Sequence, residues 1–161
     1  MGNAKMIRTA VIDDINSINV LHEQLHIQHI GYRPDIFAKV EQPIFDKLMI
    51  PYVSDDDKRI FVSENGGMID GYAAVSVHDT VKRAGEIQPF VFIEVEELCV
   101  ADSARGNGIG SSLLDAVKKF GSEKGARFVE LSVHAENEAA QEFYKANGMF
   151  VKTLKMQYKL Q

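Results

Sequence analysis

Three glycines within five residues, Gly106, Gly108 and Gly110, stand between a strand-like run and a helical run. The strand-like run, Val91–Val100, precedes them, and the helical run carries apolar residues on one face: Ile109, Leu113, Leu114, Val117 and Phe120. Glycines in such a turn let the backbone approach a ligand closely, and the N–H groups that begin the helix attract phosphate. We therefore expect a phosphate-binding turn at this junction.

Two common nucleotide-binding motifs do not have this spacing. A P-loop places a lysine and then Ser or Thr directly after its last glycine, whereas Gly110 is followed by Ser111 and Ser112. A dinucleotide-binding fingerprint has its third glycine three residues after the second, and that position after Gly108 holds Ser111. Both motifs fit the turn poorly.

Strand and helix patterns alternate along the 161 residues, which predicts one domain, residues 1–161. In the first half we expect a strand at Lys5–Thr9 and a helix that begins at Asp13-Asp14, with Ile15, Ile18, Leu21 and Leu25 on one face. A weakly helical stretch follows from Pro34 to about Ile50, interrupted at Pro43, and then an acidic loop at Pro51–Lys58. The first half ends with a hairpin of Arg59–Ser63 and Asp70–Val77. In the second half we expect the strand Val91–Val100, the helix that begins at Ile109 and a strand at Phe128–His134. A last helix is capped by Asn137 and ends at Asn147-Gly148, and β-like alternation follows at Val151–Leu160. This order predicts an α/β (α+β) fold with a mixed sheet and helices on both faces.

Composition narrows the class of protein. The net charge of −5 argues against a broad nucleic-acid surface, and no apolar stretch approaches the roughly 18 residues of a membrane span. Cys99 is the single cysteine, so no internal disulfide can form, and a reducing compartment suits the chain. We expect a cytoplasmic protein that binds neither nucleic acid nor membrane.

The turn does match the acetyltransferase signature Gln/Arg-x-x-Gly-x-Gly/Ala, as Arg105-Gly106-Asn107-Gly108-Ile109-Gly110. Further segments agree in order: the hairpin around Asn65-Gly66, the strand at Leu98-Cys99-Val100, and the closing helix with Asn137, Phe143-Tyr144 and Asn147-Gly148. Over about 90 residues the chain resembles the GCN5-related N-acetyltransferase (GNAT) family. That resemblance implies a mixed, mostly antiparallel, twisted sheet of six to seven strands.

The resemblance also implies acetyl-CoA as co-substrate, without a metal. The backbone of Leu98, Cys99 and Val100 would pair with the pantetheine arm. The turn residues Arg105, Gly106, Asn107, Gly108, Ile109 and Gly110, with Ser111, would bind the pyrophosphate. Asn137 would steady the cofactor, and Tyr144 would lie beside its sulfur and protonate the leaving thiolate. A homodimer is compatible with the family.

A general base is needed because only about 0.1% of a primary amine with a pKa of ~10.4 is neutral near pH 7. Glu94, Glu96 and Glu97 are the candidates. Simple alternation puts Glu94 and Glu96 on the face of Leu98 and Val100, with Glu97 on the other, although a bulge would reverse this at one end. We favour Glu96 and Glu94 as candidates for the general base and do not choose between them.

A rival motif lies in the first helix. His22-Glu23-Gln24-Leu25-His26 has the His-Glu-x-x-His pattern of zinc hydrolases, although His29 stands where the extended pattern requires glycine. The alternative interpretation treats His22 and His29 as residues at the edge of the helix's apolar stripe. Contact of His22, His26 or His29 with substrate stays open.

The sequence therefore predicts an N-acetyltransferase in which a primary amine attacks acetyl-CoA directly in a ternary complex. Two alternatives are a catalytically silent acyl-CoA-binding sensor and the zinc hydrolase. The acceptor, a small-molecule or peptide amine, is not specified, and polyamines, antibiotics, amino acids, peptide N-termini and lysine side chains all fit. The net charge of −5 favours a cationic amine.

Overall fold

The computed structural model describes residues 6–40, 42–80 and 85–161. Its strands are β1 (Met6–Thr9), β2 (Lys58–Asn65), β3 (Met68–Asp79), β4 (Val91–Val100) and β5 (Phe128–Leu131). Its helices are α1 (Ile15–Tyr32), α2 (Gln42–Ser54), α3 (Ile109–Glu123) and α4 (Glu138–Ala146), and short 3-10 helices precede α1 and follow β4. The predicted order of elements is confirmed up to the end of α4.

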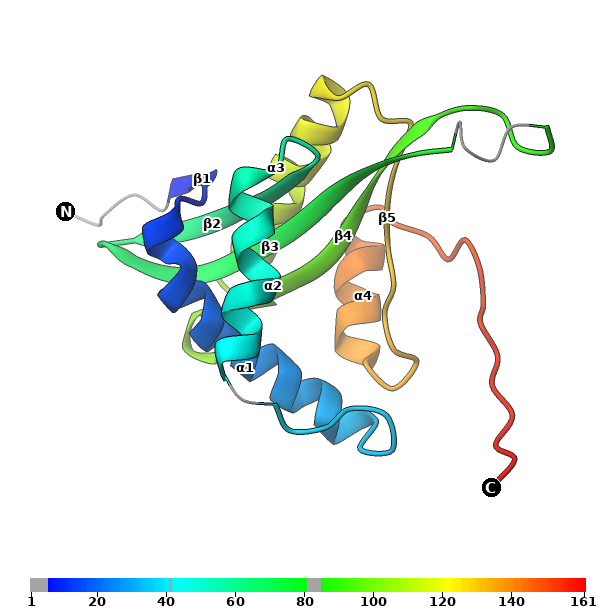
Figure 1. Ribbon diagram of the computed structural model, residues 1–161, viewed down its shortest axis with the longest axis horizontal. Coiled ribbons are helices and arrows are strands. Elements are labelled where there is room, and N and C mark those ends of the chain that lie inside the picture. Colours follow the sequence, from blue (N-terminus) through cyan, green and yellow to red (C-terminus); the bar gives the residue numbers. More distant parts are fainter. Residues whose placement is uncertain (1–5, 41, 81–84) are drawn as a thin grey trace.

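The strands form a single sheet in the order β1-β2-β3-β4-β5. Neighbouring strands are antiparallel except β4 and β5, which are parallel and are joined through α3. Helices α1 and α2 cover one face of the sheet and α3 covers the other, while α4 lies beside β5 (Figure 1). The predicted mixed α/β architecture is therefore confirmed, and the described residues form five strands instead of the expected six to seven.

Each face of the sheet has its own hydrophobic core. The first core joins α1 and α2 to the sheet through Ile18, Leu21 and Met49, which pack with Ile60, Val62, Tyr72, Ala74 and Cys99. The second joins α3 to the sheet through Ile109, Leu113, Val117 and Phe120, which pack with Ala73, Val75, Ile93 and Val95. The apolar faces that the sequence assigned to α1 and α3 are thus the buried ones.

Two local predictions for the first half of the chain are wrong. The stretch 34–40 is not helical, and α2 begins at Gln42 with Pro43 in its first turn, where a missing N–H costs nothing. Helix α2 then continues to Ser54 through Pro51, in what the sequence suggested was an acidic loop. In the β2–β3 hairpin, Gly66 and Gly67 have the positive φ values that such a turn requires, while Asn65 is still part of β2.

The end of the chain also differs from the prediction. Strand β5 stops at Leu131, three residues before the predicted end at His134, and Val133 is exposed. Residues 151–160, predicted to be strand-like, are extended but pair with no strand. In Figure 1 this segment runs clear of the sheet. Alternation predicts a strand only where a second strand supplies hydrogen bonds, and the described chain supplies none here.

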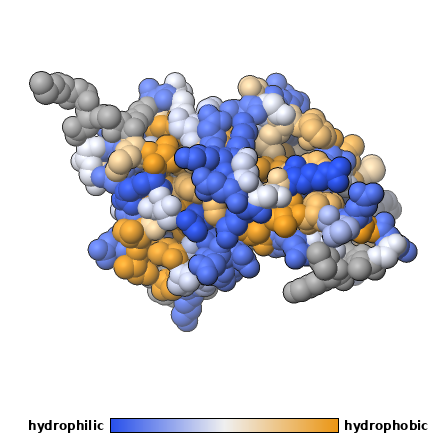
Figure 2. All heavy atoms as spheres, turned by 90° about the horizontal axis from the view of Figure 1, so that it is seen from above, coloured by the Kyte–Doolittle hydropathy of each residue, from blue (hydrophilic) through white to orange (hydrophobic). Residues whose placement is uncertain are grey.

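Hydrophobic surface remains exposed elsewhere too. On the face shown in Figure 2, hydrophobic residues lie on both sides of a hydrophilic band. Within the part of the chain that the structure describes, no helix has the length and apolar character to cross a membrane.

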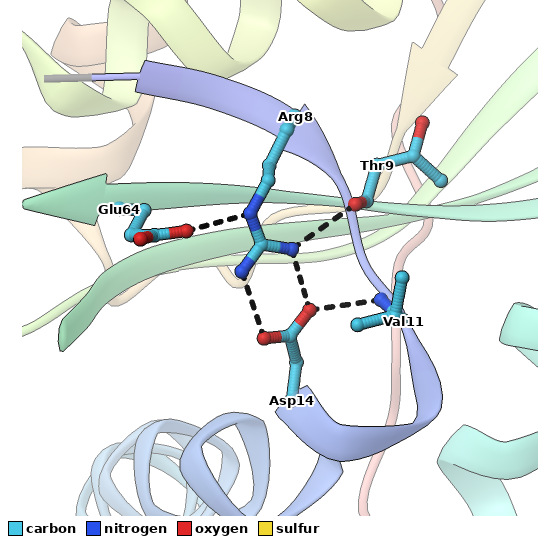
Figure 3. Close-up of polar contacts among 5 residues, drawn as sticks. All are labelled: Arg8, Thr9, Val11, Asp14 and Glu64. Carbon is cyan, nitrogen blue, oxygen red and sulfur yellow. Dashed lines mark hydrogen bonds and ion pairs between the residues drawn. The ribbon is translucent and has the colours of Figure 1, made fainter. Parts of the chain in front are cut away.

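An ionic network attaches the start of α1 to the edge of the sheet (Figure 3). The Arg8 guanidinium of β1 donates to both carboxylate oxygens of Asp14, at 2.7 and 2.9 Å, and its Nε donates to Glu64 at 2.6 Å. Asp14 also accepts the Val11 N–H at 2.8 Å. The hydrogen bonds from Arg8 are the main reason that the pKa of the buried Asp14 carboxyl lies below its ordinary value.

This lowered pKa has a definite consequence for stability. Ionised Asp14 contributes stability that is complete above its unfolded pKa of about 3.9 and is lost as the pH falls through the lower folded pKa. We expect Asp14→Asn to lower the free energy of unfolding at neutral pH by about 1–3 kcal/mol, and the difference from wild type to narrow below about pH 4. Urea unfolding across this pH range measures it. Asp13→Asn, at an exposed neighbour, should have little effect, and equal losses for the two variants would contradict the account.

Candidate active site

A β-bulge in β4 determines where the glutamates of this strand point. Opposite β3, Ala74 pairs with Glu97 and Val75 pairs with Val95, so Glu96 is the extra residue. Val95 and Leu98 therefore both pack in the core under α3, while Cys99 packs in the core under α1 and α2. Simple alternation, which puts Glu96 on the face of Leu98 and Glu97 on the other, is therefore wrong for Glu96, and the bulge that the sequence analysis allowed for is present.

The bulge opens a pocket between the sheet and α2. Its volume is about 180 Å³, and its lining residues are Leu48, Met49 and Tyr52 from α2, Ala74 from β3, and Glu96 and Glu97 from β4. Burial and then the charges of Glu96 and Glu97 raise the pKa of Tyr52 to about 12. The pocket thus combines apolar walls with two carboxylates and a phenol that stays protonated at neutral pH.

Glu97 is fixed by two buried side chains that the sequence analysis did not connect with it. The Tyr72 hydroxyl donates to Glu97 Oε2 at 2.6 Å, and His22 Nδ1 lies 2.8 Å from the same oxygen. Tyr72 is fully buried, and burial followed by the Glu97 charge raises the pKa of its hydroxyl well above the ordinary value. These contacts join α1, β3 and β4 at the base of the pocket, and no local sequence signal could have predicted them.

The two glutamates favoured from the sequence differ in position. Glu96 lines the pocket, accepts a hydrogen bond from the Ser76 hydroxyl at 2.5 Å and lies 4.0 Å from His78 Nε2. Glu94 does not line the pocket and is aligned with Ser76 on one side and Glu130 on the other. Burial and then the Glu96 charge raise the pKa of Glu94.

The glycine turn has the geometry expected of an anion site. Gly108 caps α3 with φ at 77°, in the left-handed region, and a Cβ built on Gly106 or Gly108 would meet only open space. Ser112 is the first residue of α3 whose N–H has a helical acceptor, the Gly108 carbonyl at 3.1 Å. In the described chain the N–H groups of Ile109, Gly110 and Ser111 donate to no carbonyl. The turn therefore has three N–H groups that are free to bind an anion.

Beside this turn, one edge of β4 is unpaired. Within the described residues, only Phe92–Val95 of β4 pairs with β5, so residues 96–100 have no strand on that side. These residues include the predicted cofactor contacts Leu98, Cys99 and Val100. Gln24 of α1 holds the end of the strand: it donates to the Val100 carbonyl at 3.0 Å and accepts the Asp102 N–H at 3.1 Å. Arg105 lies at this end in an ion pair with Asp102 at 2.9 Å.

Helix α4 supplies the remaining predicted residues. Asn137 caps it by accepting the Ala140 N–H at 3.1 Å, which is the predicted capping role. A Cβ on Gly110 would lie 3.0 Å from the Phe143 ring, so α4 packs closely on the start of α3. Tyr144 is half-buried next to Phe143, and burial raises its pKa to about 12. Its hydroxyl is protonated at neutral pH.

The histidines of the rival motif have separate partners. His22 contacts Glu97, whereas His26 Nε2 lies 2.6 Å from the Ala38 carbonyl oxygen. His29 packs with Phe37 and His134, and burial followed by the nearby His134 lowers its pKa. Across residues 6–40, 42–80 and 85–161, no group of three or more His, Cys, Asp or Glu side chains could hold a metal ion.

Cys99 is buried against α1, with its Sγ 3.4 Å from the Leu21 carbonyl oxygen. Burial raises the pKa of the thiol to about 12. Because the thiolate is the nucleophilic form, a thiol with this pKa is suited to packing.

Curated relatives match parts of the chain. An uncharacterized N-acetyltransferase of Methanocaldococcus jannaschii is 33% identical over 93 residues, which are 58% of this chain and 39% of that protein. An aminoglycoside N(6')-acetyltransferase type 1 of Salmonella typhimurium is 28% identical over 88 residues, which are 55% of this chain and 59% of that protein. The matches thus span about two fifths to three fifths of the relatives' own length.

The fold agrees over nearly the whole chain with a solved structure, a tetramutant of the BH1408 protein from Bacillus halodurans. The identity is 26% and the TM-score is 0.87, with 96% of this chain and 99% of that chain covered. The model of the "Acetyltransferase (GNAT) family" matches residues 23–149, which include the bulged strand, the glycine turn and α4. The chain therefore belongs to the acetyltransferase (GNAT) family.

Proposed function

We propose that the protein is an N-acetyltransferase that transfers the acetyl group of acetyl-CoA to a primary amine carrying positive charge. The observation that carries this proposal is the pocket at the β4 bulge, where Glu96 and Glu97 lie beneath the apolar side chains of α2. A pair of carboxylates in a pocket with largely apolar walls suits an ammonium group on a short carbon chain. Membership of the family supports the acetyl donor.

Acetyl-CoA fits the surface between the unpaired β4 edge and the glycine turn. The N–H groups of Ile109, Gly110 and Ser111 can bind pyrophosphate, and the open space at Gly106 and Gly108 leaves room for it. The backbone of Leu98–Val100 can pair with the amides of the pantetheine arm, as an added strand would. Asn137 Oδ1 already caps α4, so this residue would contact the cofactor through its amide nitrogen.

The carboxylates can perform two parts of the reaction. Glu97, fixed by Tyr72 and His22, attracts the protonated amine and holds it in place. Glu96, at the more exposed side of the pocket, accepts the proton that the amine must lose before it can attack the thioester. We therefore propose Glu96 as the general base. Glu94 lies outside the pocket and contributes to the negative electrostatic potential within it.

Tyr144 is the proposed acid for the leaving group. Expulsion of coenzyme A leaves a thiolate, and a phenol with a pKa of about 12 carries its proton at neutral pH. The position of Tyr144 on α4, beside a ring that packs on the glycine turn, is consistent with a place near the cofactor sulfur. A backbone N–H of β4 would stabilise the oxyanion that forms on attack.

The name of the Salmonella relative supports the charged acceptor, because aminoglycosides carry several amines. A pocket of about 180 Å³ accommodates an aminoalkyl end, and a larger acceptor would extend out of it. Polyamines and basic peptides fit the same description. This proposal names the acceptor class, a primary ammonium on a cationic molecule.

The cofactor half of the proposal predicts a selective binding defect. In Gly108→Val, a side chain would fill the open space where the pyrophosphate binds, so the thermal shift caused by acetyl-CoA should disappear. Gly125→Val is the matched control: Gly125 also has a positive φ and open surroundings, but it lies past the other end of α3. Both variants should be somewhat less stable, and only Gly125→Val should keep the shift. Normal acetyl-CoA affinity in Gly108→Val would contradict the assignment of the turn.

The acceptor half predicts a charge-dependent defect. Glu96→Gln and Glu97→Gln should each lower kcat/KM for a cationic amine by roughly 10²-fold or more, and the wild-type value should fall as salt rises. Loss of the base in Glu96→Gln should also change the pH profile of kcat. Glu123→Gln, at the exposed end of α3, should have no effect. Unchanged turnover in both pocket variants, or a preference for acidic amines, would contradict this half.

A further inference from the structure

Tyr52 places a polar group on the α2 side of the pocket, where its described neighbours from the same helix, Leu48 and Met49, are apolar. The carboxylates of Glu96 and Glu97 belong to β4, so they lie on the sheet side of the same pocket. The phenol is therefore placed across the pocket from the groups that would bind the ammonium. Neither of the proton transfers proposed for the reaction involves it.

The Tyr52 ring is held in place before any ligand arrives. It is half-buried and packs on the hydrophobic core between the sheet, α1 and α2. Lys58 Nζ lies 5.0 Å from the centre of the ring, in a cation–π contact. A side chain that is already ordered loses little conformational entropy on binding. The hydroxyl is thus a pre-organised part of the pocket.

The Tyr52 hydroxyl carries a proton that no acceptor takes within the described residues. The pKa of about 12 keeps this group in its neutral, donating form. The two nearby carboxylates have other donors: Glu96 Oε1 accepts from Ser76, and Glu97 Oε2 accepts from Tyr72. A half-buried donor of this kind gains most from a ligand that supplies the missing acceptor.

The charges of the pocket restrict what this acceptor atom is. The ammonium group of a bound amine goes to the carboxylates, because hydrogen bonds between charged partners are the stronger ones. A carboxylate or phosphate oxygen on the same ligand would be repelled by Glu96 and Glu97. A neutral oxygen, from a hydroxyl or an ether, has neither difficulty.

We propose that Tyr52 selects among cationic amines by donating its hydroxyl proton in a hydrogen bond to a neutral oxygen that the acceptor carries close to its reacting ammonium. This inference rests on the proposed function, because it takes the ammonium to lie at Glu96 and Glu97. It narrows the acceptor class to oxygenated amines, such as amino alcohols. The bond is present before and during the reaction, so it lowers KM and leaves kcat nearly unchanged.

Two proteins and two acceptors, each pair differing by a single oxygen, test the inference. The acceptors are a diaminopropane and the diaminopropanol with a hydroxyl on its middle carbon, and the proteins are wild type and Tyr52→Phe. The dissociation constant of each diamine is measured by calorimetry on protein saturated with coenzyme A, where no acetyl group can be transferred. Steady-state kinetics with acetyl-CoA then give KM and kcat. Tyr158→Phe, at a tyrosine that is 85% exposed, is the matched control.

In Tyr52→Phe we expect the dissociation constant and the KM of diaminopropanol to rise by roughly 5- to 10-fold, because one hydrogen bond is lost. The values for diaminopropane should change by less than about twofold, since this acceptor has no oxygen to lose. The phenylalanine ring keeps the contacts with the core and with Lys58, so thermal unfolding should change little. Tyr158→Phe should equal wild type with both acceptors.

Three results would overturn the inference. Equal losses for the two diamines would mean that Tyr52 is only a wall of the pocket, and an unchanged dissociation constant for diaminopropanol would mean that its hydroxyl does not bind the oxygen. A wild-type protein that binds neither diamine would overturn this inference together with the proposed function. Diamines that bind with the expected ratios but are never acetylated would contradict the proposed function alone and would support the role of Tyr52.

Discussion

The bulge in β4 is the constraint on which the rest of the site depends. One extra residue between Val95 and Glu97 lets the strand contribute to the core under α3 on both sides of the bulge. The same extra residue turns two adjacent carboxylates toward α2. Without the bulge, regular alternation would place one of the two in the apolar core, where an unpaired charge is costly. The acidic pocket and the continuous core are therefore consequences of a single irregularity.

The buried polar contacts around Glu97 connect the fold to the proposed chemistry. Tyr72 belongs to the first core, and its hydroxyl donates to the Glu97 carboxylate. His22 reaches the same oxygen from α1. A carboxylate held in this way is a rigid feature of the pocket, whereas Glu96 contacts solvent and a serine hydroxyl. Glu97 is thus held rigidly, as a residue that binds the ammonium group should be, whereas Glu96 has the contact with solvent that a general base needs to release its proton.

Much of the architecture follows from local sequence signals. The apolar face of α3, the glycine turn and the Asn137 cap depend on residues close together in the chain, and the structure has them as predicted. The partners of Glu97 are 25 and 75 residues away, and no local pattern indicates them. A bulge in β4 was considered from the sequence, but its position could not be predicted because it depends on the register with β3. The strand predicted at Val151–Leu160 is absent from the described residues, because alternation alone does not make a strand where no second strand supplies hydrogen bonds.

The measurement that tests the central claim most directly is acetyl transfer by the unmodified protein. Acetyl-CoA is incubated with the protein and a panel of cationic, neutral and acidic primary amines, and release of the free thiol is followed together with the mass of the acetylated amine. The account predicts turnover, with the cationic amines as the best acceptors. Binding of acetyl-CoA without turnover on any amine would contradict it and would identify a silent acyl-CoA-binding protein instead.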